Sequence, residues 1–259
     1  MRKRINKKID LLVVFLLLGI TAAISLIFNF KPLIAFLLYL LSPSIYLILR
    51  EKKNFFKIFW AVVVFGIIFG FGFDFVVTLN EGWIVTQLVL PLRLFGFYPI
   101  LDDVLAFMLM TLFIVVFYEH FLDDEKNRRI SNNLKWLITF SLVILILIFT
   151  AYLINPNFLR IPYAYLVGGI FAIAFPFVFS LYKLRFLEKF LKLAAFFFVV
   201  WFVLELICLK AGGWIFPGEY IGMVEIFGVK FPFEELFFWM MWYAAAVVSY
   251  YESFIDDQK

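Results

Sequence analysis

The amino-acid sequence predicts an all-α integral membrane protein. Hydrophobic residues make up 65% of the 259 residues and charged residues only 16%, with a mean hydropathy of +1.02. These values lie outside the range of soluble globular domains. Apolar runs recur along the chain, and a motif of acidic residues occurs twice at a nearly constant spacing. Together these observations predict about eight transmembrane helices, arranged as two tandem parallel four-helix repeats.

Eight apolar runs have about the length that crosses roughly 30 Å of hydrocarbon. In chain order they cover 10–29, 32–49, 55–77, 100–121, 134–154, 160–182, 187–209 and 233–254. The first run lacks a small-residue cleavage site and leads directly into the second, so we expect a retained helix rather than a signal peptide. Pro43 and Pro176 are expected to bend the second and sixth helices alike. Glycines in GIIFGFGFD, at 66–74, indicate close helix packing in the third.

The longest polar stretch, LDDEKNRRISNNLK near 122–135, separates four runs from four. We therefore expect a first membrane repeat at 1–127 and a second at 128–259. Because each repeat has an even number of helices, a two-fold axis along the membrane normal should relate them. Apolar but broken stretches at 78–99 and 210–232 precede the last helix of each repeat. We expect both to fold back at the membrane interface, anchored at headgroup level by Trp83 and Trp214.

The basic residues are distributed unequally between the two sides of the predicted bundle. Of the 23 Lys and Arg residues, one side holds five, namely Lys31, Arg93, Arg160, Lys210 and Lys230. The positive-inside rule then places both termini in the cytoplasm, in a multi-pass protein of the cell membrane. This asymmetry accounts for the net charge of +4. The basic balance therefore indicates contact with the lipid bilayer and no nucleic-acid partner.

The most specific signal is a motif of acids that occurs twice. The first copy consists of Asp74, Gly82-Trp83-Ile84 and Asp102-Asp103, and the second of Glu205, Gly213-Trp214-Ile215 and Glu234-Glu235. An offset of 131 or 132 residues relates the copies, and Tyr251-Glu252 follows Tyr118-Glu119 at a similar distance. Ionisable groups at membrane depth are costly, so a duplicated unit that keeps them predicts a functional site.

Two interpretations of the acid pairs are open. Carboxylates near a helix N-terminus can cap free N–H groups, which accounts for one acid at each helix start. Capping does not account for the adjacent second acid, which points about 100° away, or for Asp74 and Glu205 on the preceding helices. Because the third and fourth helices of a repeat are antiparallel, these acids could converge at one membrane face. A buried, protonated carboxyl there would serve as a general acid.

Aromatic residues make up 22% of the chain, and we attribute most of them to lipid contact and core packing. In FPFEELFFWMMWY, at 231–243, they surround the second acid pair. Aromatic faces in that position would stabilise a carbocation by cation–π attraction. The acid pairs and the aromatic residues together favour protonation of an apolar substrate.

Several other kinds of site are excluded by composition. The single histidine, His120, is expected to be an interfacial residue without a catalytic role, and the single cysteine, Cys208, a small core residue. Metal sites built from His or Cys, His-dependent triads and an internal disulfide are therefore excluded. The sequence also lacks a phosphate-binding Gly loop and clustered Asp residues spaced for magnesium diphosphate. We expect no cofactor.

The second copy of the motif resembles the lycopene cyclase domain of the small membrane-integral type, found as two subunits or as a tandem fusion. The matching residues there are Pro232, Glu234, Glu235, Phe237, Phe238, Trp214 and Glu205; the weaker matches in the first copy are Pro99, Asp102, Asp103, Phe107, Trp83 and Asp74. The resemblance covers roughly 30–121 and 160–254. Asp102-Asp103 replaces the family's Glu-Glu, Glu205 replaces its usual Asp, and the first and fifth helices are additions to its three-helix domain.

The resemblance implies carotenoid biosynthesis by cofactor-independent isomerisation. A carboxylic acid would protonate the terminal double bond of lycopene or a related polyene, the end would close into a six-membered ring, and a base would remove a proton. The implied acid and base are Glu234 and Glu235, with Glu205 in support. Asp102, Asp103 and Asp74 would form a second active end or a structural counterpart. The implied substrate contacts are Trp214, Phe237, Phe238, Trp83 and Phe107, and other carotenoid enzymes are candidate partners.

Two further function classes remain open. Parallel repeats with buried acids also describe small proton-coupled secondary transporters, which would show pH-dependent uptake and a polar cavity. The sequence offers few Asn, Gln, Ser or Thr residues to line such a cavity. In a non-catalytic membrane scaffold, the acids would only cap helices, and substituting them would change folding alone.

Overall fold

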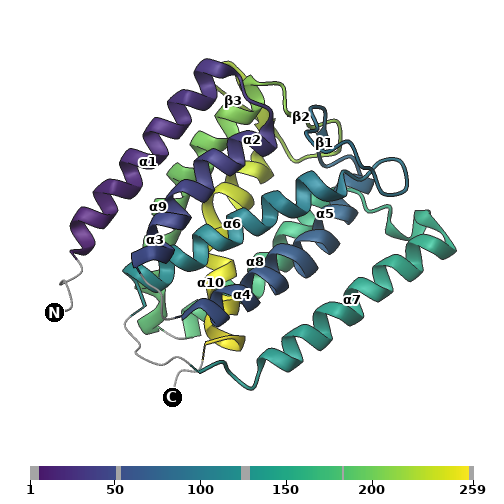
Figure 1. Cartoon of the computed structure of the whole chain (residues 1–259). Helices are drawn as coiled ribbons and strands as arrows, with labels where there is room; N and C mark the ends of the chain where they lie inside the picture. The colour runs from purple at the N-terminus through teal and green to yellow at the C-terminus, as the bar shows by residue number, and fades with distance from the viewer. Residues whose placement is uncertain (1–5, 51–53, 124–128, 183, 257–259) are drawn as a thin grey trace.

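The computed structural model describes residues 6–50, 54–123, 129–182 and 184–256, and it shows a bundle of long helices (Figure 1). This confirms the predicted all-α membrane class. Among the described residues, six helical stretches are long and apolar enough to cross a membrane: Lys7–Phe28, Pro32–Arg50, Phe55–Leu79, Ile100–Phe121, Leu134–Ile154 and Leu187–Lys210. The predicted total of eight spanning helices and the repeat layout stay predictions.

Several of the stretches consist of consecutive helical elements. The N-terminal elements are α1 (Lys7–Phe28), α2 (Pro32–Phe36), η1 (Leu37–Leu41), α3 (Ser42–Arg50), α4 (Phe55–Ala61), η3 (Val62–Phe69), α5 (Gly70–Leu79) and α6 (Ile100–Phe121). The later helices are α7 (Leu134–Ile154), the 3₁₀ turn η4 (Pro156–Leu159), α8 (Ala164–Tyr182), α9 (Leu184–Lys210), η5 (Glu235–Trp242) and α10 (Tyr243–Phe254). Each of the eight predicted apolar runs coincides with helix in the structure, to within a few residues at either end. The predicted boundary between the repeats touches residues 124–128, which lie outside the described residues.

Helices α1 and α7 lie at opposite edges of the bundle, and α6 crosses its middle (Figure 1). Only 28% of the most apolar window of α1 and 11% of that of α7 is buried, against 61% for α6. The two outer helices therefore present most of their apolar surface to the bilayer. They correspond to the first and fifth predicted helices.

The predicted close packing of the glycine-rich third helix is confirmed. A Cβ atom built on Gly66 would lie 2.8 Å from the Cα of Met108, and one on Gly70 would lie 2.8 Å from the ring of Phe107. Both partners belong to α6. Small residues allow this approach because helix association within lipid depends on close backbone contact.

Helices α5 and α9 end in the same way, at equivalent positions of the repeated motif. Glu81 and Gly212 adopt positive φ angles of 59° and 66°. The next residue folds back in each case: the N–H of Gly82 donates to the carbonyl of Val77, and that of Gly213 to Cys208, both at 2.9 Å. This is the hydrogen-bond pattern of a Schellman motif. The Gly-Trp-Ile motif thus begins with a glycine that terminates a helix.

The two Gly-Trp-Ile segments then pair with one another. Strand β1 (Ile84–Val85) lies antiparallel to β2 (Trp214–Ile215), and Ile84 faces Ile215. These two isoleucines occupy the same position in the two copies of the motif. A pairing of a residue with its own counterpart is what a two-fold axis between equivalent halves produces.

The broken stretches contain β structure that the sequence did not predict, and their expected place at the membrane interface stays a prediction. Strands β3 (Met223–Ile226) and β4 (Val229–Pro232) form a hairpin. Its two loop residues, Phe227 and Gly228, have φ angles of 53° and 75°, as a type I′ turn requires. Tyr220 joins this stretch to the other half, because its hydroxyl donates to the carbonyl of Gly82 at 2.8 Å. Burial raises the pKa of Tyr220, so the hydroxyl remains a donor.

The opposite end of the bundle, where α1 begins and α10 ends (Figure 1), contains a second reciprocal contact. The hydroxyl of Tyr118 donates to Glu252, and that of Tyr251 donates to Glu119. Each tyrosine therefore binds the glutamate of the other Tyr-Glu pair. Their rings meet edge to face, with centroids 6.2 Å apart.

Substituting Gly213 with alanine should destabilise the protein by about 1–3 kcal/mol, the usual cost of overpacking. The new Cβ would lie 2.3 Å from the Cγ of Pro32 and 3.0 Å from the carbonyl of Cys208. Gly19→Ala is the matched control, since nothing lies within 4 Å of a Cβ there. Thermal unfolding in detergent should show a lower midpoint for Gly213→Ala than for Gly19→Ala, and equal midpoints would contradict this packing.

Candidate functional site

A cavity lies at the end of the bundle that carries β1 and β2, and both copies of the motif line it. Its volume is about 90 Å³. Five of the six motif acids contribute to the lining: Asp74 from α5, Asp102 and Asp103 from α6, Glu205 from α9 and Glu235 from η5. Acids that are far apart in the sequence thus converge on one space, as predicted for each repeat and here for both together.

The two acids of each pair have different surroundings. Asp102 accepts hydrogen bonds from the backbone N–H groups of Val89 and Leu90, at 2.7 and 2.8 Å. Glu234 accepts one from the N–H of Ile221 at 2.8 Å. In both copies the first acid therefore ties down the loop that precedes its own helix. The two acids of a pair therefore have separate roles, which explains why two adjacent acids occur where helix capping needs only one.

The second acid of each pair faces the cavity, together with the acid from the preceding helix. Tyr165, which is 1% exposed, donates its hydroxyl to Glu235. The indole Nε1 of Trp214 donates to Glu205 at 2.8 Å. A buried carboxylate needs such donors because it has lost its water.

Trp83, the motif counterpart of Trp214, is among the groups that act on the charge of Asp74. Of the two indoles, Trp214 makes the well-aligned hydrogen bond to the acid of its own motif copy. Both indoles line the cavity. Their expected role as headgroup anchors stays a prediction.

Asp74 and Asp103 both line the cavity and are 0% and 9% exposed. Asp103 is among the groups that act on the charge of Asp74. One oxygen of each aspartate, and the hydroxyl of Tyr98, is buried without a hydrogen-bond partner among the described residues. Two ionised carboxylates in one buried space repel each other, so their burial together is favourable when one of them carries a proton. Burial raises the pKa of Tyr98, in the loop beside them, so its hydroxyl stays protonated.

Aromatic rings form much of the remaining wall. Trp83 meets Tyr165 edge to face, with centroids 5.0 Å apart, and Phe107 meets Trp239 in the same way at 5.4 Å. Trp83 and Trp239 are 6.2 Å apart. The carboxyls are thus enclosed by π faces, which attract a positive charge.

Three predicted site residues do not line the cavity. Glu234 is fully buried but binds the loop, as described above. Phe237 is 39% exposed and stacks on Phe233. Phe238 packs at Gly169, where an added Cβ would lie 2.6 Å from its ring. Successive residues of η5 point in different directions around the helix, so the Glu-Glu-Leu-Phe-Phe motif cannot face one space.

The structure adds cavity residues that the sequence did not indicate. Tyr165, Trp201 and Trp239 line the cavity beside the predicted acids. Tyr165 has no counterpart in the first half, where Ile34 stands at the same offset. The internal repeat therefore gave no signal for it. Trp239 lies within the aromatic segment that was singled out, but its position at the wall is set by the turn of η5.

The remaining candidates have structural surroundings. Cys208 is fully buried, as expected. His120 is 2% exposed, and its Nε2 lies 2.9 Å from Asp10, an acid that also binds Tyr46 and Arg50. The ring is buried within the protein against Asp10 of α1, and the expected interfacial position of His120 stays a prediction.

No protein-family model, no curated protein and no solved structure matches this chain. The resemblance described above therefore depends on the motif residues, and function is argued from the geometry of the site.

Removing the first acid of a pair should loosen the loop that it holds. Asp102→Ala leaves two backbone N–H groups without an acceptor, at a cost of about 1–3 kcal/mol. Hydrogen–deuterium exchange at Val89 and Leu90 should then accelerate by roughly tenfold or more. Asp103→Asn, at the adjacent position, is the control and should leave exchange there unchanged. Equal exchange in the two variants would contradict the division of roles.

Proposed function

We propose that this protein catalyses the acid-initiated cyclisation of an acyclic polyene end, as in a lycopene β-cyclase. The observation that supports the proposal is the shared cavity, in which carboxyls from both motif copies are surrounded by aromatic rings. Ring closure of a polyene needs a proton donor, a surface that stabilises a carbocation, and a base. The cavity contains groups suited to all three tasks.

The proposed donor is Asp103, a buried carboxyl that lines the cavity together with Asp74. The proposed acceptor is Glu235, which accepts a hydrogen bond from Tyr165. Donation forms a C–H bond at the terminal double bond, the resulting cation closes a C–C bond to give the ring, and loss of a ring proton restores a double bond. The proton count and oxidation state are unchanged, so the reaction consumes no oxidant, reductant or cofactor.

Glu205 supports this chemistry by adding negative potential near the cation. Trp214 donates to it and keeps its orientation fixed. Asp102 and Glu234 hold the two loops that contribute Val85 and Trp214 to the cavity wall, and ordered loops there would limit water that could quench the cation. One shared cavity also favours a single active site over two independent ones.

The proposed substrate is a carotenoid polyene such as lycopene, which would enter from the bilayer. A multi-pass protein with cytoplasmic termini, built from two tandem repeats, is part of the same proposal. The supporting observations are six long apolar helices and the reciprocal contacts at both ends of the bundle. Other carotenoid enzymes are the proposed neighbours, because an apolar substrate must pass between them within the membrane.

Expression in a bacterial host that accumulates lycopene tests the proposal directly. Pigment chromatography should show ring-closed products with the wild-type protein. Asp103→Asn and Glu235→Gln should each lower turnover by about 10²-fold or more, because general acid–base groups contribute about that much. Glu225→Gln, on the β3–β4 hairpin away from the cavity, is the control and should keep full activity.

Unchanged lycopene, despite good membrane expression of wild-type protein, would contradict the proposed reaction. A cyclase that tolerates both Asp103→Asn and Glu235→Gln would contradict the assigned roles. If the product forms with Asp103→Asn but not with Glu235→Gln, the proton comes from the second half of the chain instead.

A small proton-coupled transporter is the alternative class. Buried carboxyls at both ends of the bundle favour it. Against it, the described cavity lining contains no Asn, Gln, Ser or Thr, and Tyr165 is its only residue with a hydroxyl side chain. The transporter would show pH-dependent uptake in vesicles, which the cyclase would lack.

A further inference from the structure

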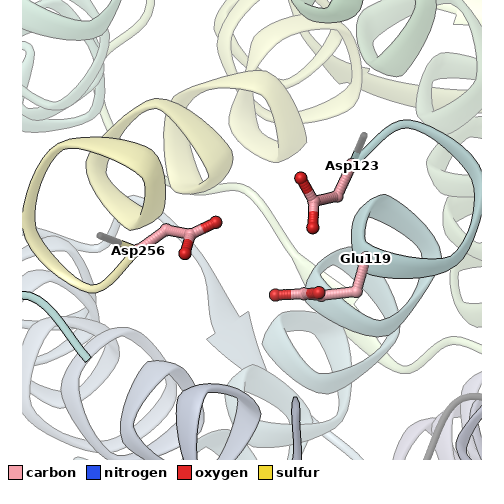
Figure 2. A group of neighbouring side chains, drawn as sticks. All are labelled: Glu119, Asp123 and Asp256. Atoms are coloured by element: carbon pink, nitrogen blue, oxygen red, sulfur yellow. The ribbon is translucent and has the colours of Figure 1, made fainter. Parts of the chain in front are cut away.

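Three carboxylates converge at the end of the bundle opposite to the cavity. Glu119 comes from the last turn of α6, Asp123 follows that helix, and Asp256 follows α10. One oxygen from each lies within 4.8 Å of the others, and the three residues are 5%, 9% and 2% exposed. Figure 2 shows their carboxylates pointing toward a common space. The cyclisation chemistry uses none of them.

The bonding of these groups is incomplete. Oδ1 of Asp256 binds Lys57, but Oδ2 is buried and has no hydrogen-bond partner among the described residues. Asn54 donates its amide to Glu119, and its own Oδ1 is likewise buried without a partner. Buried oxygen atoms of this kind normally find a donor or an ion. Their presence beside the three carboxylates points to a ligand that carries positive charge.

One ammonium group already acts on this cluster. Lys57, which is 1% exposed, binds Asp256 and acts on the charge of Glu119. Lys189 lies over the ring of Tyr118, 5.7 Å from its centroid.

We propose that Glu119, Asp123 and Asp256 bind a divalent cation. The donors are all oxygen atoms, which suits hard ions of the Ca²⁺ and Mg²⁺ class and disfavours soft metals. Oxygens within 4.8 Å of one another can share one Ca²⁺ ion, whose bonds to oxygen are about 2.3–2.6 Å long. The ion would join the end of α6 to the end of α10, next to the reciprocal Tyr118–Glu252 and Tyr251–Glu119 contacts.

Terbium luminescence with the purified full chain in detergent tests the site. Tb³⁺ is a probe for oxygen-rich Ca²⁺ sites, and Tyr118 and Tyr251 lie close enough to sensitise it. Wild-type protein should bind one Tb³⁺ saturably, and CaCl₂ or MgCl₂ should displace it. Glu119→Gln and Asp256→Asn should each weaken binding by about tenfold or more. Addition of CaCl₂ or MgCl₂ should also raise the thermal midpoint of wild-type protein more than that of either variant.

Two controls separate the site from other acids. Glu188→Gln removes an exposed carboxylate, 75% exposed in its side chain, and should bind as wild-type does. Glu205→Gln removes a buried carboxyl at the cavity and should also leave Tb³⁺ binding unchanged. Asp123→Asn, at the outer edge of the cluster, replaces either variant if it aggregates. The proposal is overturned if folded wild-type protein binds no Tb³⁺, or if the cluster variants bind it as tightly as Glu188→Gln.

Discussion

Carboxyl groups buried in an apolar bundle must find hydrogen-bond donors inside the protein, because neither lipid nor water supplies them there. This requirement organises both ends of the structure. At the cavity, a loop N–H group donates to Asp102, an indole to Glu205 and a tyrosine to Glu235; beside it, a loop N–H group donates to Glu234. The loops are therefore shaped by the acids as much as by their own sequence. Aromatic residues supply many donors because a Trp or Tyr side chain is apolar except for one polar group.

The duplicated motif explains why the acids meet. Each copy ends a helix with the same turn, contributes a tryptophan to the cavity wall, and continues into a strand that pairs with the other copy at Ile84 and Ile215. This pairing brings the two copies together, and acids from both line one cavity. The copies differ at the second acid of each pair. Glu235 accepts from Tyr165, which has no counterpart in the other half, whereas one oxygen of Asp103 has no partner among the described residues.

The sequence was sufficient for the helices, their membrane character and the convergence of the acids, because hydropathy and the repeat are local or periodic signals. The sequence could not assign different roles to Glu234 and Glu235, because the two residues are identical and adjacent. Their roles differ because their side chains point in different directions around the helix. Tyr165 was not predicted because it belongs to neither copy of the motif. The cluster of Glu119, Asp123 and Asp256 was not predicted either. The repeated Tyr-Glu pair is visible in the sequence, but its crossed hydrogen bonds depend on how the two halves pack together.

Register between the halves is a harder problem in lipid than in water. Apolar helix faces gain little from contact with one another when the surrounding solvent is itself apolar, so they specify relative position weakly. Polar contacts that cross between the halves specify it strongly, because any shift leaves a buried group without its partner. Here such contacts lie at both ends of the bundle: strand pairing and loop bonds at one, crossed tyrosine–glutamate bonds at the other. A cavity wall assembled from two halves holds its geometry because both ends are fixed in this way.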